Sequence, residues 1–160
     1  MQVREIMSSP AITVGPRVEI RKVAQTMREN VISGVPVVDE GGKLLGVITE
    51  IQLIARNAPV HEPRYLAVLS AMIPVNLEEH RQYKEQLRQA LAITAADLME
   101  DEVVTIRPDA SIDEALEIML NPEVTMLPVV EGNRVIGVVT RTDLVRLIET
   151  LEATPDEPPA

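Results

Sequence analysis

The stretch Gly137-Val138-Val139-Thr140-Arg141-Thr142-Asp143-Leu144 organises this chain, because an apolar strand runs directly into the start of a helix. The first amides of a helix have no partner within the helix, and the helix dipole is positive there, so anions and hydroxyls bind at that end. Thr140 offers a hydroxyl, and Asp143 brings a carboxylate about one turn on, which suits the adjacent hydroxyls of a ribose. Arg141 adds a positive charge. Together these residues could hold a nucleotide.

The same residues also fit a capping box, in which Thr140 caps the helix and Asp143 answers at the third helical position. From this stretch alone the two interpretations have equal weight. A second copy, Gly46-Val47-Ile48-Thr49-Glu50-Ile51-Gln52-Leu53, tilts the balance towards a ligand site.

The chain contains an internal repeat, because residues 3–56 and 95–148 align as two copies of one unit. Aligned identities include Met7 with Met99, Thr13 with Thr105, Pro16 with Pro108, Met27 with Met119, and Thr49 with Thr140.

Each copy predicts the order β-α-β-β-α. A short β-rich run at residues 11–14, or 103–106, is stopped by a proline two residues on. A helix with apolar residues at helical spacing follows, then two strands joined by a turn, and then a closing helix that starts at Thr49 or Thr140. A unit of about 50 residues buries too little surface alone, so we expect the two copies to pack together.

This repeat, with Ser33-Gly34-Val35-Pro36-Val37-Val38-Asp39 and the Gly-x-Val-x-Thr-x-x-Asp ending, resembles the CBS domain (cystathionine β-synthase domain). The chain looks like a tandem CBS pair, and the resemblance covers both repeats. It implies an α/β fold: two β-α-β-β-α repeats packed as a pseudo-twofold pair, with a helical insert between them. In that family the clefts between the sheets often bind AMP, ATP or S-adenosylmethionine, and the pair regulates an attached or associated protein.

The resemblance also implies which residues of repeat 2 would hold a ligand. Two segments would surround the adenine, and the start of the closing helix would hold the ribose and phosphate. The residues are Ala110 and Thr125 for the adenine edge, Ile112 and Met126 for its faces, Asp143 for the ribose, and Thr140 with Arg141 for phosphate. An alternative for Ile112 and Met126 is plain core packing.

Repeat 1 departs from the family pattern, because Gln52 stands where repeat 2 has Asp143. A neutral amide holds hydroxyls more weakly than a carboxylate does. Glu50, at the position of Arg141, would oppose phosphate. We therefore expect a weaker or empty second cleft. Its residues would be Val18, Ile20, Ser33, Gly34, Thr49 and Gln52.

Outside the repeats, we expect an insert and a tail. The predicted organisation is repeat 1 at 1–56, a helical insert at 57–94, repeat 2 at 95–150 and a disordered tail at 151–160. Within the insert, residues 65–75 are almost all apolar, and residues 78–92 are apolar on one face, which predicts two helices broken at Pro74. Either both helices pack on their own module, or the first makes a dimer or partner contact, since an all-apolar helix must be covered.

The composition narrows the range of partners that we expect for this chain. A net charge of −10 repels a phosphate backbone, and with only two tyrosines as aromatics the chain lacks a stacking platform, so we expect no nucleic acid. The chain has no cysteine, which excludes disulfides and thiolate metal sites. No secretory signal and no apolar stretch of membrane length is visible, so we expect a cytoplasmic protein without membrane contact.

The sequence contains few groups of residues that are typical of a catalytic site. His61 and His80 lack neighbours at metal-ligand spacing, and Ser33 and Ser111 have no nearby base in sequence. We expect no catalytic residue, no metal and no required cofactor. The sequence predicts a regulatory homodimer that binds AMP, ADP, ATP or S-adenosylmethionine in the repeat 2 cleft and modulates an unidentified protein. The alternative is a structural dimerisation module without a ligand.

Overall fold

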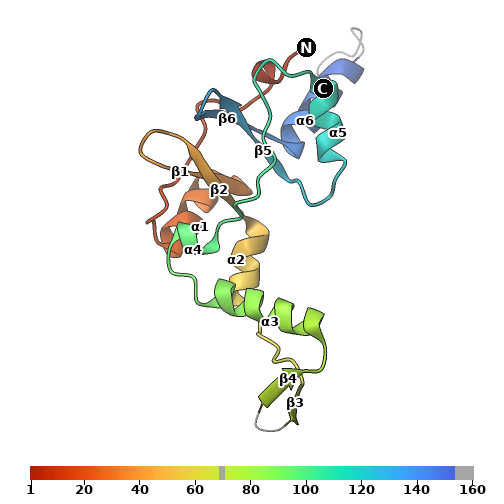
Figure 1. The fold of residues 1–160 in the computed structure, drawn as a ribbon. Coiled ribbons are helices and arrows are strands. Elements are labelled where there is room, and N and C mark those ends of the chain that lie inside the picture. Colours follow the sequence, from red (N-terminus) through yellow and green to blue (C-terminus); the bar gives the residue numbers. More distant parts are fainter. Residues whose placement is uncertain (69–70, 154–160) are drawn as a thin grey trace.

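The computed structural model describes residues 1–68 and 71–153, which form two similar α/β units and an insert that extends away from them (Figure 1). The predicted helices and paired strands are present in both copies. The first unit contains α1 (Ile20–Glu29), β1 (Gly34–Val38), β2 (Leu44–Thr49) and α2 (Glu50–Asn57). The second contains α5 (Ile112–Met119), β5 (Met126–Glu131), β6 (Arg134–Thr140) and α6 (Arg141–Glu152).

The first strand predicted in each repeat is present only as a single bridge. β1 pairs with β2 and β5 with β6, both antiparallel. Val14 makes one parallel bridge to Val37, and Ile106 makes the equivalent bridge to Val129. Each run meets a proline two residues later, which has no N–H to donate and so prevents a longer ladder.

The two units exchange their leading segments. The short helix η1 (Val3–Glu5) precedes the first unit, yet Val3 is fully buried in the core of the second. The helix α4 (Ala95–Leu98) precedes the second unit, yet Ala95 and Leu98 lie in the core of the first. Each core is therefore completed by the other repeat, which confirms the predicted packing of the copies as a pair.

Two glycines allow this exchange. A Cβ atom built on Gly46 would lie 2.6 Å from the Glu100 carbonyl oxygen, and one on Gly137 would lie 2.9 Å from that of Ser8. Backbone bridges form at these points, from Val47 to Glu100 and from Ser8 to Val138. The leading segments can approach β2 and β6 this closely only because no side chain intervenes.

The insert corrects a second prediction, because residues 65–68 and 71–74 form strands instead of the predicted helix. They contain the hairpin strands β3 (Tyr65–Val68) and β4 (Ala71–Pro74). An apolar run has no period that separates a helix from a strand, and Pro74 is tolerated at the end of an edge strand. The second predicted helix is present as α3 (Leu77–Ala90), and Asn76 caps it by accepting from Glu78 N and Glu79 N.

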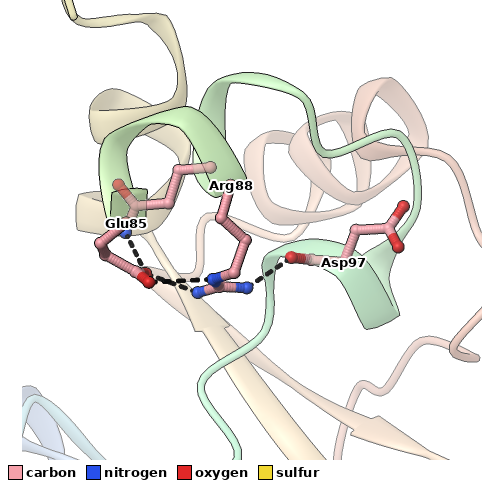
Figure 2. Close-up of polar contacts among 4 residues, drawn as sticks. Glu85, Arg88 and Asp97 are labelled. Carbon is pink, nitrogen blue, oxygen red and sulfur yellow. Dashed lines mark hydrogen bonds and ion pairs between the residues drawn. The ribbon is translucent and has the colours of Figure 1, made fainter. Parts of the chain in front are cut away.

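Polar contacts fasten α3 to its neighbours. The Arg88 guanidinium donates to the Asp97 carbonyl oxygen at 2.7 Å and pairs with Glu85 at 2.6 Å, as Figure 2 shows. The hydrogen bond from Arg88 lowers the pKa of the Glu85 carboxyl below its usual range. Arg56, near the end of α2, donates to the Ala92 carbonyl oxygen at 2.9 Å. Helix α3 is thus joined to α4, and the segment that follows α3 is joined to α2.

Helix α6 runs to Glu152, and the rest of the predicted tail, residues 154–160, lies outside the described residues. In the described part of the chain, no helix has the length and apolar character that a membrane span requires.

Candidate ligand clefts

The first candidate site is built at the start of α6. Asp143 Oδ2 accepts hydrogen bonds from the backbone N and the hydroxyl of Thr140, both at 2.8 Å. Thr140 Oγ1 in turn accepts from Asp143 N at 3.4 Å. The predicted capping box is therefore present. Asp143 is only 8% exposed, the one buried charged or polar residue among the described side chains.

The two carboxylate oxygens of Asp143 have different surroundings. Oδ2 is used by the cap, whereas Oδ1 lies 3.7 Å from Arg146 Nη1, one helical turn further on. The Arg146 side chain is 70% exposed, so this contact costs little to rearrange. The carboxylate can therefore cap the helix through one oxygen and still offer the other to a ligand.

Asp143 lies in a cleft of about 700 Å³ between the two units. Its walls come from the first leading segment, α1 and the loop that follows it, the start of α2, the end of β6 and the start of α6. Two arginines and two acidic residues line it, so its formal charge is balanced. The lining includes Ser8, Ile12, Arg28, Ser33, Gly34, Glu50, Leu53, Thr140, Asp143 and Arg146.

A second cleft of about 670 Å³ occupies the pseudo-symmetric position. At its helix start, Gln52 Oε1 replaces the carboxylate and accepts from Thr49 N at 2.8 Å. Glu100, Glu102 and Glu123 line this cleft, and its described lining includes no lysine, arginine or histidine. Its surroundings are therefore strongly acidic.

The structure divides the predicted site residues in a crossed pattern. Each cleft combines the helix start of one repeat with the loop before the first strand of the other. Thr140 and Asp143 share the first cleft with Ser33 and Gly34, whereas Thr125 and Met126 share the second with Thr49 and Gln52. Both clefts lie between the two units, so each draws residues from both repeats.

The remaining predicted residues line neither cleft. Ile20 and Ile112 are buried in the two cores, and Val18 and Ala110 pack against those cores. Arg141 instead donates Nη2 to the carbonyl oxygens of Asn121 and Pro122, at 3.1 and 2.9 Å. Its guanidinium is thus engaged with the loop before β5.

Several lining residues were not predicted from the sequence. Arg146 follows Asp143 by three residues on α6, and this helical spacing could have indicated it. Arg28 and Ser8 gave no such signal, because only the packing of the units brings them into the same cleft as Asp143. The clefts also touch: a Cβ atom on Gly34 would lie 2.5 Å from Met126 Sδ, an atom of the other cleft's wall.

No group of three or more histidine, aspartate or glutamate residues suited to a metal ion occurs within residues 1–68 and 71–153.

The comparison with known families matches this architecture. The CBS domain model matches residues 3–58 and 95–150. This chain belongs to the CBS domain family. A similar curated relative is an uncharacterized protein of Methanocaldococcus jannaschii, 32% identical over 158 residues, covering 92% of this chain and 91% of the relative.

Solved structures of CBS pairs resemble the whole chain. The structure of CBSX2 in complex with AMP has a TM-score of 0.76 at 19% identity, and covers 95% of this chain and 99% of that one. The CBS pair of protein MJ0100, in complex with 5′-methylthioadenosine and S-adenosyl-L-methionine, has a TM-score of 0.68 at 25% identity, covering 95% and 98%. These likenesses establish the fold of a CBS pair.

Proposed function

We propose that this CBS pair is a regulatory sensor that binds an adenosyl nucleotide in the first cleft. The observation that carries the proposal is Asp143, a buried carboxylate that uses one oxygen in the helix cap, has the Arg146 guanidinium 3.7 Å from the other, and shares its cleft with Arg28. Two similar CBS pairs support it, since their structures contain AMP or S-adenosyl-L-methionine. The proposed role is binding rather than catalysis.

The arrangement of groups fits the parts of an adenine nucleotide. Asp143 Oδ1 would accept hydrogen bonds from the ribose hydroxyls while Oδ2 keeps the helix cap. Arg146 and Arg28 would hold a phosphate, which both can do as planar donors. The apolar side chains of Ile12 and Leu53 offer surface for the base.

The second cleft has acidic side chains and an amide in place of the arginines and the aspartate of the first cleft. Glu100, Glu102 and Glu123 repel a phosphate, and Gln52 offers only an amide to hydroxyls. We therefore propose that the second cleft binds AMP, ADP or ATP much more weakly than the first.

The regulated partner is proposed to be another protein. Helix α2 begins in the first cleft at Glu50 and is fastened at its other end through Arg56. A ligand in the cleft can therefore bias the position of α2 and of the insert attached to it. The existence of a regulated partner and a cytoplasmic location stay predictions.

One observation favours the rival function, a structural module without a ligand. The capping box already satisfies Thr140 and one oxygen of Asp143, so neither residue needs a ligand to be stable.

Isothermal titration with AMP separates the two functions. We expect about one AMP per chain and a higher melting temperature with the ligand, because a ligand that binds only the native state stabilises it. Two equal sites per chain would contradict the asymmetry between the clefts. If AMP, ADP, ATP and S-adenosylmethionine all fail to bind, the structural module is the better function.

A further inference from the structure

Glu50 was expected to oppose a phosphate in the second cleft, but the structure places it in the lining of the first. It is the first residue of α2, and its backbone N donates to the Ser33 carbonyl oxygen at 3.0 Å. Ser33 belongs to the loop before β1 and lines the same cleft. The start of α2 is therefore fixed against a wall of the cleft that contains Asp143.

The charged side chains of the first cleft differ in their exposure. Asp143 is buried, whereas Arg28, Glu50 and Arg146 are exposed. The described lining of this cleft includes no other charged residue and no histidine. The Asp143 carboxylate thus lies at the buried end of the cleft, and two positive charges and one negative charge lie towards solvent.

Charge rather than volume limits the ligand. A cleft of about 700 Å³ is within the usual range for ligand sites, so its size does not exclude a nucleotide with two or three phosphates. A phosphate monoester such as that of AMP carries a charge of about −1.5 to −2 at pH 7, which Arg28 and Arg146 can match. Each further phosphate adds negative charge, and the lining offers no third cation to balance it. Glu50 disfavours that added charge, because like charges repel.

Glu50 also changes the character of a helix start. The first turn of a helix attracts anions, because the positive end of the helix dipole lies there. In α2 the first turn already contains the carboxylate of Glu50, whereas the first residue of α6 is Arg141. The start of α2 is therefore unsuited to a phosphate, although it lines the same cleft as the start of α6.

We propose that Glu50 makes the first cleft selective for an adenine nucleotide with a single phosphate, and that it disfavours ADP and ATP through charge repulsion. The inference rests on the proposed function, since it requires that an adenine nucleotide binds in the first cleft. It adds which nucleotide is preferred and which residue sets the preference.

Titration calorimetry on the full chain tests the preference. AMP, ADP and ATP are compared without Mg²⁺, which binds nucleotide phosphates and would mask their charge. We expect AMP to bind more tightly than ADP, and ADP more tightly than ATP. Glu50→Gln should raise the affinity for ATP relative to AMP by about 1.5- to 5-fold, the range for an exposed charge. Glu50→Lys should raise it by about 2- to 25-fold, because the change in charge is doubled.

Two controls separate repulsion at Glu50 from other effects. Glu102→Gln removes the same charge from the chain, but Glu102 lines the second cleft, so the ratio of the AMP and ATP affinities should not change. Adenosine has no phosphate, so Glu50→Gln should leave its affinity unchanged. If adenosine affinity changes as much as ATP affinity, the substitution alters the cleft itself, and the proposal is wrong.

The remaining outcomes distinguish this inference from the proposed function. A wild-type chain that binds ATP as tightly as AMP overturns the role of Glu50 but leaves the nucleotide site intact. An unchanged affinity ratio in both Glu50 variants, or an equal change in Glu102→Gln, also overturns that role. A chain that binds none of the three nucleotides overturns the inference, and binding of S-adenosylmethionine by that chain would still support an adenosyl site. A ratio that shifts towards ATP in Glu50→Gln and further in Glu50→Lys, with Glu102→Gln unchanged, supports the proposal.

Discussion

The two clefts have the same backbone plan and nearly the same volume, about 700 and 670 Å³, yet their charges differ sharply. The first contains a buried carboxylate with two arginines and Glu50, and the second contains three glutamates and an amide. The fold therefore provides two equivalent cavities, and a few side chains decide what each can hold. The four predictions below test this difference.

The largest effect is expected at Asp143. Asp143→Asn keeps the size of the side chain and much of its capping ability but removes the charge that ribose hydroxyls prefer. We expect the free energy of AMP binding to weaken by about 1.5–3 kcal/mol, the range for hydrogen bonds to charged groups. Titration calorimetry measures this change directly.

Helix α4 provides the matched control. Asp97 forms the same capping box with Thr94 but lines neither cleft. Asp97→Asn should therefore leave AMP affinity unchanged. If both variants lose the same stability and neither loses affinity, Asp143 is only a helix cap.

The second prediction compares the walls that the leading segments form. In Gly46→Ala the new Cβ would lie 2.6 Å from the carbonyl oxygen of Glu100, a residue that lines the second cleft. We expect the free energy of unfolding to fall by about 1–3 kcal/mol. Gly137→Ala should lower the free energy of unfolding less. Its new Cβ would lie 2.9 Å from the Ser8 carbonyl oxygen, and the atom closest to it belongs to the flexible Met7 side chain. Urea unfolding measures both.

Gly41→Ala is the control for this pair. Its new Cβ would come no closer than 3.4 Å, to an Asp39 side-chain oxygen, so stability should change by less than about 0.5 kcal/mol. A harmless Gly46→Ala would show that the contact between Glu100 and β2 is loose.

The third prediction separates phosphate from nucleoside. Arg146→Gln should weaken AMP binding by about 0.2–1 kcal/mol, a small effect because the guanidinium is largely exposed. Adenosine has no phosphate, so its affinity should change much less. Arg141→Gln is the control, since that guanidinium contacts the carbonyl oxygens of Asn121 and Pro122 instead of the first cleft. A larger loss in Arg141→Gln than in Arg146→Gln would reverse the assignment of the phosphate group.

The smallest effect concerns Arg88, which joins α3 to α4 through the Asp97 carbonyl oxygen; α4 is followed along the chain by Glu100 of the second cleft. Arg88 lowers the pKa of Glu85, so this pair stabilises the fold above the ordinary value of 4.5 and loses that contribution as the pH falls through the folded pKa. Both side chains are about half exposed, which limits the effect to at most about 1 kcal/mol, less at high salt. The stability difference between wild type and Arg88→Gln should shrink below pH 4.5, measured by urea unfolding at several pH values. A constant difference would mean that the bond to the Asp97 carbonyl carries the effect.

The sequence alone determined the local structure of the repeats. The spacing of apolar residues and the Thr-x-x-Asp or Thr-x-x-Gln endings specify helices, paired strands and caps that depend on near neighbours. The replacement of Asp143 by Gln52 in the other copy was also visible in the sequence. Local periodicity could not distinguish a hairpin from a helix at residues 65–75, because an apolar run without a period fits either.

Only the tertiary structure decided which residues share a cleft. Thr125 was expected to line a cleft with Asp143, but it lines the second cleft with Gln52, and Ser33 lines the first cleft with Asp143. Arg28 also lines the first cleft. These contacts join residues far apart in the chain through the packing of two units, and no local pattern encodes which unit faces which. The sequence determined the chemical groups, and the packing of the two units decided which of them meet.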